Sequence, residues 1–231
     1  MSTRTKWSMY ALAGLGLMVV MGIAGLAYAR LTGALQFYVV PTAGCEPAIP
    51  TGSYILAQGE RRPGLFDLVC YMQTNPMYER AIFVQRVCGM PGDTVQIIEG
   101  RLHINGTDRD QHLRLKHWYR VPPSVRRTMH QQGLYAVNDY LRTAAGDSTD
   151  LNMEDRIMEQ FPNTHRVVAA EPDEQIEEAF ANGWNQDRFG PCVVPMDHYF
   201  LLGDNRNQSL DSRYLGMVHA QQIVGVVFHV F

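Results

Sequence analysis

The pattern of hydrophobic and polar residues divides this chain into an apolar start, a strand-rich body and a polar middle. The start carries no charged residue from Ser8 to Ala29. After it come short runs that are rich in β-branched and aromatic residues and bounded by Gly, Pro, Asn or Asp, which is the pattern of β-strands. These runs are FYVV, SYILA, FDLVCYM, AIFVQRV, TVQIIEG, RLHING, HYFLLGD and VGVVFHVF. The sequence therefore predicts a mainly β protein preceded by one apolar helix.

A hairpin and an insertion are predicted within the β body. Two apolar runs flank Glu99-Gly100 in IIEGRLHING, and such a pair of residues suits a tight turn. Between about Thr107 and Pro195 the strand pattern stops. There, VPPSVRR and RTAAGDSTDLNMED predict polar loops, and DEQIEEAFANG predicts a short helix that Gly183 ends. We therefore expect an inserted, loop-rich segment in this part of the chain.

The apolar run predicts a transmembrane anchor, because it is long enough, at roughly 20 residues, to cross a bilayer. The alternative is a cleavable signal peptide, since Ala27 to Ala29 has the A-x-A form, although signal peptides have shorter apolar cores of about 7–15 residues. Arg4 and Lys6 precede the run and Arg30 follows it. This distribution favours a cytoplasmic N-terminus, with the main domain on the outer face of the membrane.

Composition excludes several classes of function. The net charge is −3 and the arginines are dispersed, so the chain has no basic stripe that would bind a phosphate backbone, and we expect no nucleic-acid partner. The four cysteines show no C-x-x-C spacing, so we expect no metal site and no cofactor, while up to two disulfides remain open. The chain has 18 arginines but only two lysines, Lys6 and Lys116.

Two stretches contain candidate site residues. PTAGCEPAIPTG, residues 41–52, follows soon after the apolar run and forms a turn framed by prolines and glycines. GDNRNQSLDSRYLG, residues 203–216, places Asp211 and Arg213 on one face of an extended segment, where they can pair, and adds the hydroxyl of Ser209. By its chemistry alone, the second stretch is either part of a site or a loop whose polar groups are satisfied.

The second stretch closely resembles the C-terminal signature of type I signal peptidases, the membrane-anchored serine endopeptidases that remove signal peptides from exported proteins. The resemblance extends to FGPCVVP, HYFLLGD and RVCGMPGDTV, and PTAGCEPAI is similar to the family's serine-containing turn. It covers the anchor and about residues 37–104 and 189–228.

The resemblance implies a signal peptidase I-like antiparallel β-sheet body built from residues 31–106 and 189–231. Residues 107–188 are then the inserted loop-rich segment, and residues 1–30 are the cytoplasmic N-terminus and membrane anchor.

Residue by residue, the resemblance implies that both members of the family's serine–lysine dyad are replaced. Gly44 stands at the position of the nucleophilic serine, and Cys45 stands at the position of the methionine that follows it. Gln85 precedes Arg86, at the position of the lysine that acts as general base. Glycine has no nucleophile and glutamine does not titrate, whereas the dyad needs a hydroxyl and a neutral buried amine. We therefore expect the site to be catalytically degenerate.

Other residues that match the family's site are retained. Thr42 matches a residue whose hydroxyl stabilises the oxyanion, and Ser209 matches a serine that contacts the lysine. Asp211 and Arg213 match a pair that braces the loop formed by this signature, residues 203–216 (the signature loop). For each of these residues a purely structural role is the alternative, because removing one member of an ion pair strands the charge of the other.

Three functions are compatible with these residues. The leading hypothesis is a membrane protein of the export system that binds signal peptides, or other extended segments of exported proteins, as an added strand. The second is an active peptidase that uses Cys45, with His198 or His219 as its base, or another nucleophile. Against it, Cys45 is expected to point away from a cleft that residue 44 faces, as a small buried hydrophobe. The third is a structural subunit that binds secretion or envelope partners.

Overall fold

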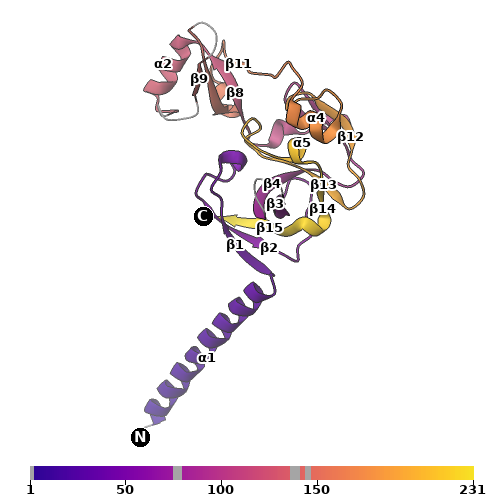
Figure 1. Cartoon of the computed structure of the whole chain (residues 1–231). Helices are drawn as coiled ribbons and strands as arrows, with labels where there is room; N and C mark the ends of the chain where they lie inside the picture. Colours follow the sequence, from indigo (N-terminus) through magenta and orange to yellow (C-terminus); the bar gives the residue numbers. More distant parts are fainter. Residues whose placement is uncertain (1–2, 75–79, 136–140, 144–146) are drawn as a thin grey trace.

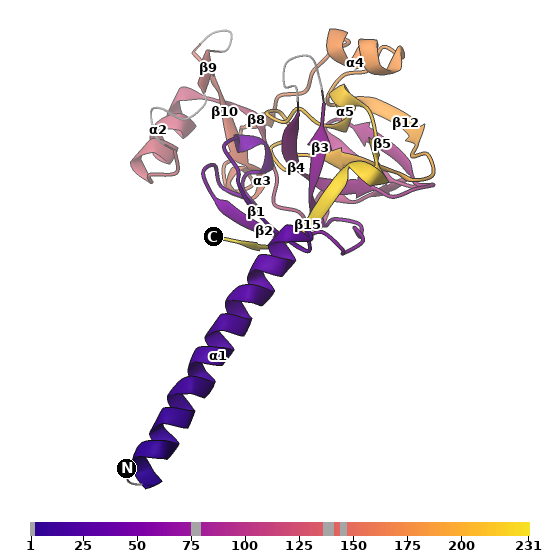
Figure 2. The same cartoon turned by 60° about the horizontal axis from the view of Figure 1, so that its bottom comes forward.

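A computed structural model describes the chain from residue 3 to residue 231, apart from residues 75–79, 136–140 and 144–146 (Figure 1). Helix α1 (Thr3–Leu31) extends away from the β body as a single rod (Figures 1 and 2). Among the described residues, Leu12–Leu31 is the one stretch that is long and apolar enough to cross a membrane. Its large apolar side chains are exposed, as expected of a helix whose surroundings are lipid.

Within the described residues, the largest sheet has seven strands and every pairing in it is antiparallel. In order across the sheet the strands are β1 (Leu35–Val39), β2 (Tyr54–Gln58), β15 (Ile223–Val230), β3 (Leu68–Gln73), β4 (Ala81–Gly89), β13 (His198–Leu202) and β14 (Val218–His219). Six of the eight predicted strand segments lie in this sheet, which confirms the mainly β, antiparallel fold. The N- and C-terminal parts of the chain are therefore interleaved in one sheet.

A second antiparallel sheet contains the other two predicted segments. Its order is β12 (Phe189–Val193), β5 (Thr94–Ile98), β6 (Arg101–Ile104) and β7 (Thr107–Asp108). The predicted hairpin is confirmed, because β5 pairs with β6 and the turn between them places Glu99 and Gly100 at φ values of 49° and 76°. Apolar residues of this sheet pack with Phe200 and Leu202 of β13, so the two sheets share a core.

The inserted segment contains more regular structure than its sequence predicts. It forms a sheet in the order β11 (His165–Arg166), β8 (Lys116–Val121), β10 (Thr149–Glu154) and β9 (Leu141–Thr143). Helices α2 (Pro123–Gln131) and α3 (Asp155–Met158) accompany it, and Met129, Leu151 and Met158 contribute to a small core of its own. The 3-10 turn η2 (Asp110–His112) precedes this sheet.

The prediction of two polar loops in the insertion is wrong. VPPSVRR contains the start of α2, because a proline fits the first turn of a helix, where its missing N–H would have no intrahelical acceptor. RTAAGDSTDLNMED contains β10, whose polar side chains are buried and paired. Asp150 accepts from Arg120 Nε at 2.9 Å, and Thr149 Oγ1 accepts from Arg126 Nη1 at 2.8 Å. Neighbouring elements supply these partners, so the polar pattern of the segment does not indicate a loop.

The predicted helix near residue 176 is confirmed as α4 (Glu174–Phe180). Its N-terminus is capped by Asp173, whose carboxylate accepts from the backbone N–H groups of Gln175 and Ile176. It ends before Gly183, since Ala181 takes the left-handed conformation that follows the last turn, with φ of 51°. Three short helical turns complete the fold: η1 (Ala43–Cys45), α5 (Ser212–Leu215) and η3 (Ala220–Gln222).

Candidate functional site

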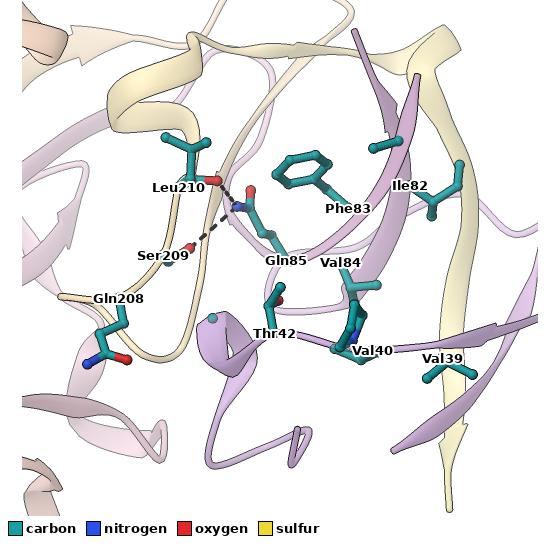
Figure 3. A pocket seen from close by; sticks show the side chains of 13 residues that line it. Val39, Val40, Thr42, Ile82, Phe83, Val84, Gln85, Gln208, Ser209 and Leu210 are labelled. Carbon is teal, nitrogen blue, oxygen red and sulfur yellow. Dashed lines mark hydrogen bonds between the residues drawn. The ribbon is translucent and has the colours of Figure 1, made fainter. Parts of the chain in front are cut away.

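A groove of about 400 Å³ lies where the two predicted site stretches meet strand β4 (Figure 3). Three segments line it: the end of β1 with the following turn, the first half of β4, and the signature loop. The lining residues are Val39, Val40, Pro41, Thr42, Gly44, Ala81, Ile82, Phe83, Val84, Gln85, Gln208, Ser209 and Leu210. The fold therefore brings Thr42, Gly44, Gln85 and Ser209 to one groove.

Gly44 is the middle residue of η1, and its backbone is held by the signature loop. Its carbonyl accepts from the backbone N–H of Asn205 at 3.0 Å. A Cβ placed on Gly44 would lie 3.6 Å from the carbonyl oxygen of Gln208 and 3.7 Å from Ser209 Oγ, which are ordinary contact distances. The turn therefore has room for a small side chain at residue 44, and glycine is not required there by sterics.

Gln85 lies on β4 and is buried, with 3% of its surface exposed. Its Nε2 donates to the carbonyl of Leu210 at 2.6 Å and to Ser209 Oγ at 3.4 Å (Figure 3). Its Oε1 accepts from the hydroxyl of Tyr71 at 2.8 Å. Both polar atoms of the amide are thus satisfied, and Gln85 joins β3, β4 and the signature loop without any group that can accept a proton at neutral pH.

Thr42 precedes η1 in an extended conformation, with φ of −119° and ψ of 154°, and its side chain does not cap the turn. It is exposed and lines the groove beside Gly44. Its hydroxyl is therefore available to a bound chain.

Cys45 points away from the groove. It is 2% exposed and packs with Val40, Ile49 and Cys70 in the core beneath the turn. Its Sγ donates to the carbonyl of Val84 at 2.8 Å. Burial, with a smaller effect of the Asp204 carboxylate, raises the pKa of this thiol. The thiol is consequently protonated at neutral pH and is a poor nucleophile.

His198 and His219 do not assist Cys45 or the groove. They face each other across the β13–β14 pair, with ring centroids 4.9 Å apart, and neither lines the groove. All four cysteines are free thiols, and three of them are buried. Among the residues described by the structure, no cluster of His, Cys, Asp or Glu is arranged to hold a metal ion.

Asp211 and Arg213, both within the signature loop, form a fully buried ion pair. Arg213 Nε and Nη2 donate to the two carboxylate oxygens of Asp211, each at 2.8 Å. Asp211 also accepts from the N–H of Gly203 at 3.1 Å, and Arg213 donates to the carbonyl of Arg206 at 2.6 Å. Burial lowers the pKa of the Arg213 guanidinium, but the charge of Asp211 and its hydrogen bonds have the larger, opposite effect. The pKa is therefore raised overall. The pair closes the loop that positions Ser209.

Two further buried ion pairs, which the sequence does not predict, hold the same loop. Arg86, the residue after Gln85, donates to Asp204 at 2.7 and 2.5 Å. Arg206 donates to Asp110 of the insertion at 2.9 and 2.7 Å. The arginine-rich composition is their only signal in the sequence, because the partners of each pair lie about a hundred residues apart along the chain.

Lys116, which lies in the insertion, is also part of this framework. Its Nζ pairs with Glu46 Oε2 at 2.9 Å, and its backbone bonds to Asp204 and Arg206 of the signature loop. Glu46 follows Gly44 by two residues, so the insertion contacts the turn directly. Burial raises the pKa of Glu46, but hydrogen bonds from Lys116 and Thr51 outweigh it and the pKa lies below its ordinary value.

Comparisons with known proteins identify the family of this chain. The family model described as "Signal peptidase, peptidase S26" matches residues 13–231. Signal peptidase I of Buchnera aphidicola is 23% identical, over 84% of this chain and 68% of that protein. Signal peptidase I of Pseudomonas aeruginosa is 27% identical, over 84% of this chain and 63% of that protein. The chain thus spans about two thirds of the length of these relatives.

Among solved structures, a signal peptidase I from Enterococcus faecalis is similar, with 22% identity, a TM-score of 0.36, and coverage of 73% of this chain and 98% of that chain. The family model covers all of the β body and most of the apolar helix. The chain belongs to the type I signal peptidase family.

Proposed function

We propose that this protein binds the signal-peptide region of exported polypeptides in the groove and does not cleave it. The observation that carries the proposal is a groove that is open and lined mainly by apolar side chains, while the nucleophile and base positions are occupied by Gly44 and Gln85. The first has no side chain, and the second uses both polar atoms of its amide within the fold. Binding needs neither group, because main-chain hydrogen bonds and shallow pockets supply it.

A strand edge supports binding of an extended polypeptide. Among the described strands, β1 is at the edge of its sheet, and its last residue, Val39, lines the groove. An added strand beside β1 can therefore bond to main-chain groups at this edge, and its alternate side chains face the apolar lining.

The apolar helix α1 supports a position at the membrane. Arg4 and Lys6 precede the span, and Arg30 lies near its other end. We infer a single-pass protein with a cytoplasmic N-terminus, which places the groove on the outer face of the membrane.

An active cysteine peptidase is the less favoured alternative. The thiol of Cys45 is buried, bonded to Val84 and directed away from the groove, so attack on a bound peptide would require the turn to be rebuilt. A nucleophile has to lie within reach of the scissile carbonyl together with its base.

The first experiment measures binding. A fluorescently labelled signal-peptide segment with small residues before its cleavage point is titrated with the full chain in detergent, and anisotropy is recorded. Ile82→Arg, which introduces a long charged side chain into the groove, should weaken binding by about tenfold or more. Val193→Arg is the matched control, because Val193 is exposed on β12 and does not line the groove. No saturable binding would overturn the proposal and favour a purely structural subunit.

The second experiment restores the chemistry. Gly44→Ser should be accommodated, given the space around residue 44, and Gln85→Lys places a buried amine beside Ser209. The double variant should cleave the bound peptide, more rapidly as the pH rises and the lysine becomes neutral. Each single variant should be inactive, because it lacks either the base or the nucleophile. Cleavage by the unaltered chain that is lost in Cys45→Ala would refute the proposal.

A further inference from the structure

A second pocket lies next to the groove, between the turn that carries Gly44 and the inserted segment. Its volume is about 380 Å³. Figures 1 and 2 show the turn beside the inserted sheet in both views. The lining residues are Glu46, Pro47, Pro50, Lys116, Leu134, Asn152, Met153, Glu154 and Ile157. One wall therefore comes from the second half of the turn, and the other from the insertion.

The turn contributes lining residues to both the groove and the second pocket. Gly44 lines the groove and Glu46 lines the second pocket. The Cα atoms of Gly44 and Glu46 lie at most about 7.6 Å apart, because consecutive Cα atoms lie about 3.8 Å apart. An extended polypeptide advances about 3.3 Å per residue. A chain that fills the groove and continues past Gly44 thus needs only two or three more residues to reach the second pocket.

The charged groups of the second pocket are already neutralised. Lys116 Nζ pairs with Glu46 at 2.9 Å, and Glu154 pairs with Arg114 at 2.8 Å. The rest of the lining is mainly apolar, with Met153 and Ile157 on the side of the insertion. An additional charge in this pocket would lose hydration without gaining a free partner, so the chemistry favours an uncharged, apolar side chain.

One polar group of the second pocket lacks a partner. Asn152 is 6% exposed and lines the pocket, and its Nδ2 donates to Asn205 Oδ1 at 3.0 Å. Its Oδ1 is buried and has no hydrogen-bond partner among the described residues.

From these features we propose that the second pocket binds the beginning of the mature segment of the same polypeptide whose signal-peptide region lies in the groove, and that it selects an uncharged apolar side chain there. This inference rests on the proposed function. It gives the inserted segment a role in recognition: the groove binds residues before the cleavage position, and the insertion binds residues after it.

Peptide length tests this inference on the unaltered full chain in detergent. A short labelled peptide ends at the cleavage position, and a long peptide continues into a mature segment that contains a leucine. A third peptide has glutamate in place of that leucine. Burial of one leucine side chain should make the long peptide bind about tenfold more tightly than the short one. The glutamate peptide should bind no more tightly than the short one.

A pair of variants assigns the gain to the second pocket. Ile157→Glu places a carboxylate in the wall and should remove the tenfold gain while the affinity for the short peptide stays unchanged. Gln160→Glu makes the same change of charge at an exposed position just after α3, outside the pocket, and should retain the gain. Unchanged binding of the short peptide also shows that each variant is folded.

The outcomes separate the two proposals. If the short peptide binds and the leucine extension adds nothing, the inference about the second pocket is wrong and the proposed function stands. If the glutamate peptide gains as much as the leucine peptide, the apolar selection is wrong. If no peptide binds, the proposed function fails and the inference fails with it.

Discussion

Replacing Asp211 with asparagine isolates the energetic role of the signature loop. Asp211→Asn keeps the size of the side chain but removes the charge that neutralises Arg213, which is 1% exposed. It also leaves an amide NH₂ group among donors, because Asp211 accepts from Arg213 Nε and Nη2 and from the N–H of Gly203. Arg213 stays charged at any accessible pH, so it cannot respond by losing its proton.

The expected magnitude follows from burial. Removing one partner of a buried ion pair costs about 3–5 kcal/mol, because the other charge is left without compensation. This is a large part of the roughly 5–15 kcal/mol that stabilises a typical domain. For a domain of this size, such a loss lowers the midpoint of thermal unfolding by roughly 6–20 °C, at about 2–4 °C per kcal/mol.

Urea unfolding of the detergent-solubilised chain measures this loss, with tryptophan fluorescence, to which the buried Trp118 contributes, as the signal. Glu99→Gln is the matched control, since it removes the partner of Arg188 from an ion pair whose side chains are 49% and 56% exposed. An exposed pair contributes about 0–1 kcal/mol, so the control should barely shift the midpoint. If both variants lose the same free energy of unfolding, the buried pair does not brace the loop and the reasoning is refuted.

Three further predictions concern the turn and the residues that contact it. Gly203→Ala should destabilise the protein by about 1–3 kcal/mol, because the added Cβ would lie 2.4 Å from the carbonyl oxygen of Gly44. Gly44→Ala should be tolerated, and equal unfolding midpoints for the two variants would contradict this prediction. The thiol of Cys45 should react with iodoacetamide far more slowly in the folded chain than in urea, as followed by mass spectrometry, and rapid labelling of the folded chain would contradict its burial. The pKa of Glu46 is lowered on folding, so its stabilising effect is complete above its ordinary value of 4.5 and disappears as the pH falls through the lower folded value. Lys116→Met should therefore reduce this acid-dependent part of the stability by about 1 kcal/mol in urea titrations at successive pH values, and an unchanged pH profile would show that the pair contributes nothing.

The β body could be predicted from the sequence because its signal is local. Strand runs such as HYFLLGD and AIFVQRV combine β-branched and aromatic residues with clear boundaries, and both are strands in the fold. The turn at Glu99-Gly100 is equally local, since two consecutive residues supply the positive φ angles that a tight hairpin requires. The loop predicted at RTAAGDSTDLNMED was wrong because strand β10, which lies in it, is polar and is stabilised by arginines from other elements, and no local pattern reports such partners.

The sequence by itself determined the family, the apolar helix, the strands of the β body, and the absence of a hydroxyl at residue 44 and of an amine at residue 85. Only the tertiary structure decided which partners these positions have: Gln85 is satisfied by Tyr71 and Leu210, and Cys45 bonds to the carbonyl of Val84. It also decided that Lys116 reaches the turn and forms a second pocket beside it. The physical reason is that the burial and the hydrogen bonding of a side chain depend on contacts between residues far apart in the chain. Residue identity and strand pattern, in contrast, involve only neighbouring residues.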